Sequence, residues 1–246
     1  MAHATIAREH GIAEDQIGVN GVALLYAATT NTIPSAYWLV VNVWQHPELV
    51  KKIREEMQPL VGFSQRDGVR VAALDMSQLN DRHLIVQCCM ESIRLANQTV
   101  DARHVLRDTI FTDSAGNKHL FRAGANIIWS VKTMHHSKNV WGEDALEFDP
   151  SRFGDRKRDR RGQAYAPFGG GTHLCPGREF AYAAILGFAT ILVLGFNLRL
   201  ENSSIRVGKA RLGEATAKPP ADGGRGGVQI SRRGGWEDVR WKLTGS

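Results

Sequence analysis

A glycine-rich loop that contains a cysteine and leads directly into an apolar segment is the most constraining feature of this chain. The loop runs from Tyr165 to Gly177 as YAPFGGGTHLCPG, and an uncharged run from Phe180 to Phe196 follows it. Glycines let a backbone turn tightly and approach a flat ligand closely, and a helix that begins just after Cys175 would stabilise its thiolate. We therefore predict that Cys175 is an anionic ligand. A structural cysteine in a glycine-rich turn is the alternative, whereas a phosphate-binding P-loop is disfavoured because its Lys-Ser/Thr ending is absent.

The apolar run after this loop could be a core helix or a membrane span. Its length reaches the lower limit for a span, but the charged residues Arg178 and Glu179 stand at its start and no second span accompanies it. We therefore predict a loop and buried helix over residues 165–196. The N-terminus mixes charged and apolar residues without the order of a signal peptide. We expect neither a signal peptide nor a clear transmembrane anchor in this chain.

The chain length suits one large domain or two modest ones, and we expect residues 1–246 to form a compact globular chain in a reducing compartment. The formal net charge of +6 does not require a nucleic-acid partner, and we expect none. Only three cysteines occur, and Cys88 and Cys89 are adjacent, so no disulfide framework is available. We predict that these two adjacent cysteines pack in the core.

Hydrophobic patterning predicts two further helices. The first spans residues 15–44 and contains Pro34. Proline has no N–H, so the carbonyl of Thr30 should lose its helical partner and the helix should kink there. The second helix spans residues 77–96, with Ser77 as its N-cap.

Between and after these helices the sequence predicts loops and short strands. Residues 58–76 have the composition of a loop, and residues 132–174 are predicted to be mostly irregular. We interpret His135 and His136, inside the second of these stretches, as loop surface. The predicted strands flank turn residues, and they are residues 109–112, 118–121 and 125–131.

In the glycine-rich loop the chain resembles the cytochrome P450 superfamily, whose haem-binding signature is Phe-x-x-Gly-x-His/Arg-x-Cys-x-Gly. The residues that match the signature in order are Phe168, Gly171, His173, Cys175 and Gly177, with Gly169 in the same turn. The resemblance implies a haem b cofactor whose iron takes the Cys175 thiolate as its axial ligand. It also implies that His173 lies near a haem propionate.

Two charged motifs elsewhere strengthen this resemblance. Glu91 and Arg94 match the Glu-x-x-Arg helix of the family, in which the spacing places both charges on one face. Arg152 in the sequence PSRF matches a later Pro-x-Arg-Phe element, and the resemblance implies that it joins that pair in a charge triad that braces the haem loop. Arg103 falls where the family commonly places a propionate-binding arginine. Each motif alone could be a solvated ion pair, but their order and spacing argue against this.

The first long helix resembles the P450 helix that crosses above the haem, which usually carries Ala-Gly-x-Asp/Glu-Thr-Thr. Here Thr30 replaces the acid and Asn31 the customary threonine, and Thr32 follows. An amide can form hydrogen bonds but does not titrate near neutral pH, so proton delivery must be rearranged. Ordinary helix polarity that is satisfied locally is the alternative. The Asn-Thr-Ile-Pro run resembles the branch that contains sterol 7α- and 12α-hydroxylases and prostacyclin synthase, which holds both oxygenases and an isomerase.

The resemblance implies a mainly α fold with a small β portion, equivalent to the C-terminal half of the P450 fold without the N-terminal half. It implies a haem-thiolate monooxygenase that inserts one oxygen atom from O2 into a lipophilic substrate, such as a steroid, a terpenoid or another secondary metabolite. Electrons would come from NADPH through cytochrome P450 reductase. The alternatives are a P450-type isomerase or dehydratase that needs no reductase, and a non-catalytic fragment.

The same resemblance carries expectations about partners and location. A missing N-terminal half, or a complementary chain in its place, would cover apolar faces that a shortened chain leaves exposed. The expected location is the cytoplasm or the cytoplasmic face of the endoplasmic reticulum.

Overall fold

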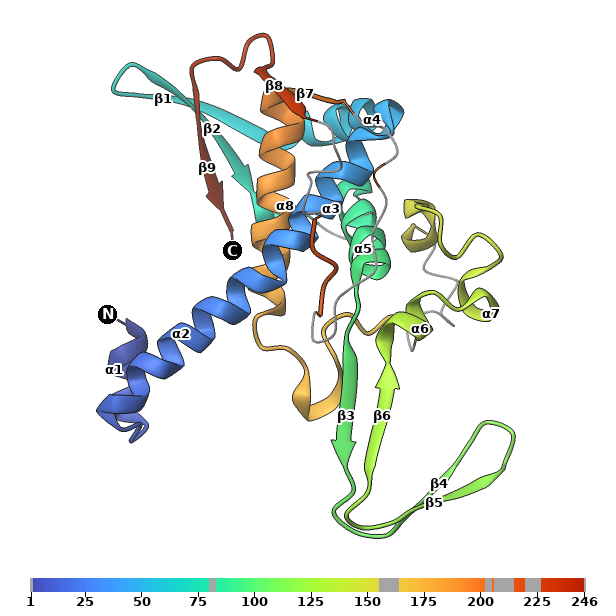
Figure 1. Ribbon diagram of the computed structural model, residues 1–246. Coiled ribbons are helices and arrows are strands. Elements are labelled where there is room, and N and C mark those ends of the chain that lie inside the picture. The colour runs from blue at the N-terminus through green and yellow to red at the C-terminus, as the bar shows by residue number, and fades with distance from the viewer. Residues whose placement is uncertain are drawn as a thin grey trace.

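Helices dominate the computed structural model, which describes residues 2–79, 83–154, 164–201, 205, 215–219 and 227–245. The longer helices are α1 (Ala2–Glu9), α2 (Glu14–Thr30), α3 (Thr32–Trp44), α4 (Pro47–Met57), α5 (Leu84–Ala96) and α8 (Arg178–Gly195). The short helices are α6 (Val131–His135), α7 (Lys138–Trp141), η1 (Gln58–Leu60), η2 (Met76–Gln78), η3 (Pro150–Phe153) and η5 (Gly171–His173). Helices α3, α4, α5 and α8 pack together, whereas α2 extends away from them (Figure 1). The fold is mainly α with a small β portion, as the sequence predicts.

The strands of the described residues form small separate sheets. They are β1 (Val61–Arg66), β2 (Val69–Asp75), β3 (Val100–His104), β4 (Thr109–Thr112), β5 (Lys118–Phe121), β6 (Asn126–Ser130), β7 (Phe196–Leu200), β8 (Val228–Arg232) and β9 (Val239–Thr244). The largest sheet has the order β1-β2-β9, and the other strands pair as β3-β6, β4-β5 and β7-β8. Strand β9 runs parallel to β2, with Leu74 opposite Leu243, and the other pairs are antiparallel.

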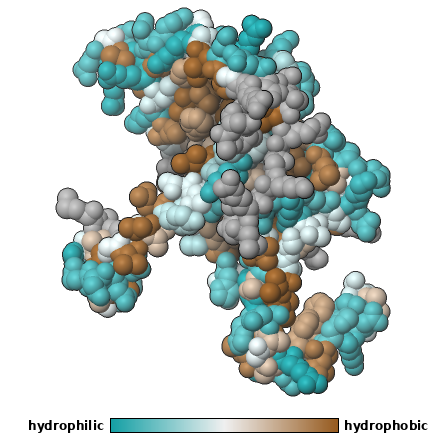
Figure 2. Space-filling view, viewed as in Figure 1, coloured by the Kyte–Doolittle hydropathy of each residue, from teal (hydrophilic) through white to brown (hydrophobic). Residues whose placement is uncertain are grey.

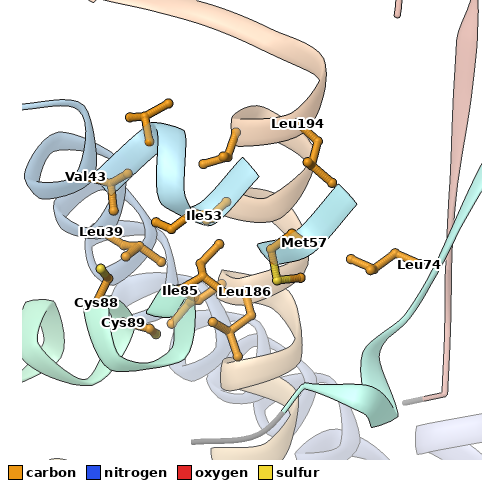
Figure 3. Close-up of a cluster of buried hydrophobic side chains, with 14 of the residues drawn as sticks. Leu39, Val43, Ile53, Met57, Leu74, Ile85, Cys88, Cys89, Leu186 and Leu194 are labelled. Carbon is orange, nitrogen blue, oxygen red and sulfur yellow. The ribbon is translucent and has the colours of Figure 1, made fainter. Parts of the chain in front are cut away.

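Buried apolar side chains from four helices form the core (Figure 3). Residues four apart lie on one helix face, and each helix contributes such a face or a close equivalent. The contributing residues include Leu39 and Val43 of α3, Ile53 and Met57 of α4, Ile85, Cys88 and Cys89 of α5, and Leu186 and Leu194 of α8. Burial of one such leucine or isoleucine stabilises the fold by about 1.5–3 kcal/mol. The predicted burial of Cys88 and Cys89 is confirmed.

The helix predicted over residues 15–44 is divided into α2 and α3 at Asn31. Asn31 has φ −108° and ψ −37°, and its carbonyl accepts the N–H of Ser35, so helical hydrogen bonding resumes immediately afterwards. Pro34 is the third residue of α3. The interruption lies one turn before the proline, where a missing N–H is expected to break the helix.

The helix predicted over residues 77–96 begins later, at Leu84. Ser77 is not its N-cap. It belongs instead to the short helix η2, where its N–H and its hydroxyl both donate to the carboxylate of Asp75, at 3.0 and 2.6 Å. The local Asp-x-Ser geometry therefore competes successfully with a longer α-helix at this point.

The loop predicted over residues 58–76 is wrong, because strands β1 and β2 form a hairpin there. Asp67 and Gly68 make its turn with φ of 50° and 76°, as a tight hairpin turn requires. Strand β2 is held on its other edge by β9, which lies far along the chain. Downstream, the predicted strands 109–112 and 118–121 are confirmed as β4 and β5, and β6 covers most of the segment predicted over 125–131.

Helix α2 presents a long apolar surface to solvent, which is visible as brown patches on the projecting arm in Figure 2. The exposed apolar residues of this helix are Val19, Val22, Leu24, Leu25 and Tyr26. Helix α8 is the one helix of the described residues whose length and composition would allow it to cross a membrane, and half of it is buried within the fold. Its buried side is part of the core, as a core helix requires.

Candidate active site: a cysteine loop with a buried charge network

The glycine-rich loop folds back on itself before α8. The N–H of Cys175 donates to the carbonyl of Phe168 at 2.9 Å, and the N–H of Leu174 donates to that of Gly171 at 3.1 Å. Gly169 and Gly171 have φ of 74° and 61°, a region that other residues rarely adopt. These turns make a compact loop in which the two glycines are required by the backbone conformation.

Cys175 is exposed at the end of this loop, three residues before the first residue of α8. A helix N-terminus favours negative charge on a nearby thiol. The other two cysteines are buried, and burial raises the pKa of Cys88 to about 12 and the pKa of Cys89 further still. Of the three thiols, that of Cys175 therefore has the environment of a ligand.

The donor set at Cys175 fits a haem group. No cluster of three or more His, Cys, Asp or Glu side chains suited to a metal occurs within the described ranges. Haem iron needs no such cluster, because the porphyrin supplies most of its ligands and the protein can supply a single thiolate. The Cβ of a residue in place of Gly177 would stand 3.9 Å from the Cys175 sulfur, in ordinary van der Waals contact with it.

Other residues singled out from the sequence surround the loop. The Arg103 guanidinium on β3 donates to the carbonyl of Gly170 at 3.4 Å and stacks over Trp129, 5.1 Å from its ring centroid. Phe168 packs against Tyr182 of α8, with ring centroids 5.2 Å apart. His173 lies exposed in η5. The structure thus places Arg103 of β3 against the loop that contains Phe168 and His173.

Glu91, Arg94 and Arg152 meet in a buried charge network. Arg94 donates to both oxygens of Glu91, at 2.6 and 2.7 Å, and the Nε atom of Arg152 lies 3.3 Å from Oε1 of Glu91. Their side chains are 0%, 0% and 3% exposed. Such a bidentate arginine–carboxylate pair is among the stronger charge-assisted contacts. The spacing of the first two residues along α5 places them on one face, and η3 supplies the third.

Backbone carbonyls and a further carboxylate complete this network. Arg94 also donates to the carbonyls of His135 and Ala145, the latter at 2.8 Å. Arg152 pairs with Asp144 at 2.6 Å, and this hydrogen bond lowers the pKa of the Asp144 carboxyl below its usual value. Sequence reasoning missed Asp144, because its separation from Arg152 matches no helical spacing.

The interpretation of His135 and His136 as loop surface is wrong. His135 is fully buried and His136 is half-buried. Burial lowers the pKa of both imidazoles, to about 4 for His135. The signal that could have located them is their position just after strand β6. This strand pairs with β3, and the short helix α6 that follows it packs against α5.

The three distal residues Thr30, Asn31 and Thr32 occupy the junction between α2 and α3. The Thr30 hydroxyl donates to the carbonyl of Tyr26 at 2.5 Å, so its proton is engaged within its own helix. The side-chain oxygen Oδ1 of Asn31 is buried and has no hydrogen-bond partner among the described residues. A buried amide oxygen of this kind is a place where a water or ligand donor would bind. In the described part of the chain, no hydrogen bond connects this junction to the cysteine loop.

Comparison with known proteins gives a consistent family assignment. A relative from Gibberella zeae, a cytochrome P450 monooxygenase, is 33% identical over 97% of this chain and 48% of its own length. The cytochrome P450 monooxygenase nodJ of Hypoxylon pulicicidum is 26% identical over 91% of the chain and 44% of its own length. The human 7-alpha-hydroxycholest-4-en-3-one 12-alpha-hydroxylase is 26% identical over 87% and 46%.

The chain spans about half the length of the curated relatives that it matches. The family model of cytochrome P450 matches residues 3–220, from α1 to beyond β7. That match includes the cysteine loop, the charge network and the α2–α3 junction, which are the parts of the site described above. The chain therefore belongs to the cytochrome P450 family.

Proposed function

We propose that this chain is the haem-binding part of a cytochrome P450 monooxygenase and that Cys175 is the axial thiolate ligand of haem b. The observation that carries the proposal is an exposed cysteine at the start of an apolar helix, in a loop whose backbone requires glycine. When bound, the haem supplies the activation of O2 and the insertion of one oxygen atom into substrate. The residues of the chain hold that group and control its surroundings.

Each neighbouring residue has a role suited to its chemistry. Arg103 and His173 would bind the haem propionates, since both can donate hydrogen bonds to carboxylates. Phe168 and the glycines at 169, 171 and 177 would let the loop lie close to the haem face. The network of Glu91, Arg94 and Arg152 would support the loop through His135, which contacts both.

On the opposite side, the α2–α3 junction would manage protons. Asn31 has a free amide oxygen that can accept a hydrogen bond from a water. Thr30 and Thr32 flank it with hydroxyl groups. Because none of these groups is acidic, we propose that a water held by Asn31 takes the place of the acid that Thr30 replaces.

The substrate that we propose is lipophilic and resembles a steroid, a terpenoid or another secondary metabolite. Relatives that support this class include the 12-alpha-hydroxylase described above and abscisic acid 8'-hydroxylase 3 of Oryza sativa. Electrons would come from NADPH through cytochrome P450 reductase. We propose the cytoplasm or the cytoplasmic face of the endoplasmic reticulum as the location.

A P450-type isomerase or dehydratase is the second candidate function. The observation that favours it is the amide at position 31, which provides hydrogen bonds but no titratable acid for oxygen activation. Such an enzyme would rearrange an oxygenated substrate without NADPH. Product formation that continues when NADPH and reductase are omitted would favour this second function over the monooxygenase.

The test of haem ligation is the spectrum of the purified chain reconstituted with haem, reduced and exposed to carbon monoxide. We expect a thiolate-ligated spectrum in the wild type. Cys175→Ser should lose this spectrum, because only another thiolate in place of Cys175 could preserve it. Cys88→Ala removes a buried thiol and is the control that should keep the spectrum. A wild-type spectrum without thiolate ligation would overturn the proposal.

A further inference from the structure

His135 is a buried imidazole with two hydrogen-bond partners that fix its state. It ends α6, and its Nδ1 atom lies 3.2 Å from the carbonyl of Arg94, while its Nε2 atom lies 3.2 Å from the N–H of Ala166. A carbonyl only accepts and an N–H only donates. The ring must therefore carry its proton on Nδ1 and accept at Nε2, which is possible only for the neutral imidazole.

This histidine connects the charge network to the cysteine loop. Arg94 donates to the carbonyl of His135, and His135 donates back to the carbonyl of Arg94, so the two residues are joined in both directions. Arg94 in turn binds Glu91 through two hydrogen bonds. The contact between Nε2 and Ala166 then extends the same series of bonds to the beginning of the loop that holds Cys175.

Three consecutive residues at the beginning of the loop are held by different parts of the fold. The Tyr165 hydroxyl donates to a carbonyl of α5, and its ring stacks on His135 with centroids 5.4 Å apart. The carbonyl of Pro167 accepts a hydrogen bond from Asn97 at 3.1 Å. Ala166 lies between these two and is held by His135. Among these bonds, the one to Ala166 is the one whose acceptor is lost when the imidazole is protonated.

We propose that His135 is a positioning residue that holds the beginning of the Cys175 loop in the geometry required for haem ligation. The proposal rests on the proposed function for one point, namely that the loop ligates haem. The contacts of His135 with Arg94 and Ala166 do not depend on haem. Arg94 of α5, His136 just after α6 and Tyr165 of the loop are the charged or titratable groups around the ring. Burial is the main factor that opposes a positive charge on the ring, and the charges of Arg94 and His136 oppose it further, which favours the neutral form that binds Ala166.

The test compares His135→Phe with His136→Phe in the haem-free chain. The first variant keeps an aromatic ring next to Tyr165 but removes both hydrogen bonds. The second is a matched control, because His136 bonds to the carbonyl of Leu95 and makes no hydrogen bond to the loop. The measurement is amide hydrogen exchange at Ala166, with amides in the middle of α8 as the reference for global unfolding.

We expect exchange at Ala166 to accelerate about 10-fold or more in His135→Phe and to change less than about 2-fold in His136→Phe, while the α8 amides keep their rates. With haem added, we expect a smaller thiolate-ligated fraction in His135→Phe than in the control. Equal exchange at Ala166 in both variants and the wild type would overturn the proposal. Equal acceleration at Ala166 and in α8 would also overturn it, because the effect would then be general loss of stability.

A second variant keeps the proposal testable if His135→Phe does not fold. His135→Asn has a shorter amide that can reach only one of the two partners, so exchange at Ala166 should still exceed that of the wild type. Unchanged exchange in this variant would overturn the proposal. Failure of the proposed function has a different signature, since the wild type would then lack thiolate ligation whatever the exchange rates are.

Discussion

Replacing Glu91 by glutamine removes one charge from the centre of the buried network and keeps the shape of the side chain. Glu91 accepts hydrogen bonds from Arg94 at two atoms and from the N–H of Asp149, and Arg152 lies 3.3 Å away. Glutamine can accept at only one oxygen, and its amide would place N–H donors against a guanidinium that also donates. Both arginines would then remain buried with less compensation for their charge.

The structure allows an order of magnitude for this loss. Arg94 and Glu91 have no exposed side-chain surface, so solvent does not screen their interaction. Removal of one partner from such a pair destabilises proteins by about 3–5 kcal/mol, mostly because the remaining charge stays buried. Against a total stability of about 5–15 kcal/mol this is a large fraction. For a chain of this size it corresponds to a fall in the melting temperature of about 6–20 °C.

The assay is thermal unfolding of the purified chain followed by circular dichroism, with Glu143→Gln as the matched control. Glu143 forms an ion pair with Lys138 at a similar distance, 2.8 Å, but the two side chains are 88% and 59% exposed. An exposed pair contributes about 0–1 kcal/mol, so the control should shift the melting temperature by only a few degrees. If Glu91→Gln and Glu143→Gln shift it equally, the reasoning from burial is refuted.

Three further predictions concern the loop and the distal junction. Cys175→Ala should abolish the thiolate band of the reduced carbon monoxide complex while leaving the far-ultraviolet circular dichroism spectrum unchanged. In an active preparation, Asn31→Leu should uncouple NADPH consumption from product formation and Asn31→Thr should keep partial coupling, so equal coupling in both would assign Asn31 no role in proton delivery. Because burial lowers the pKa of His135 to about 4, below its unfolded value of about 6.5, its contribution to stability is present above pH 6.5 and is lost as the pH falls towards 4. Urea unfolding should show that the free energy of unfolding falls between pH 7 and pH 4.5, and His135→Phe should make this dependence on pH smaller.

Much of the site could be predicted from the sequence because its determinants are local. The glycines and the cysteine of the loop all lie within residues 169–177, and the positive φ angles of Gly169 and Gly171 are ones that glycine adopts readily. Glu91 and Arg94 are three residues apart on one helix, so their contact needs only helical geometry. The β4-β5 hairpin is equally local, since its turn carries Asp113 and Gly116 between two short strands.

The features that sequence reasoning missed have different origins. Strands β1 and β2 carry a local hairpin signal, Asp67-Gly68, which the sequence analysis did not use, and β2 also pairs with β9 from the other end of the chain. The burial of His135 requires α5 and the cysteine loop to meet at α6. Neither partner lies near His135 in the sequence. Ser77 was misassigned for the opposite reason, because a very local hydrogen bond to Asp75 defeated a longer helical pattern.

The site divides into an exposed reactive part and a buried supporting part, and this division has a consequence for mutations. Cys175 is exposed and its hydrogen bonds to Phe168 and Arg178 are made by its backbone, so Cys175→Ala should change stability by less than about 0.5 kcal/mol. Glu91 is buried and its loss should cost about ten times as much. Because the two side chains share no hydrogen-bond partner, their effects on stability should add in the double variant. The same two changes should not add in haem spectra, since a loop without Cys175 has no thiolate for the network to position.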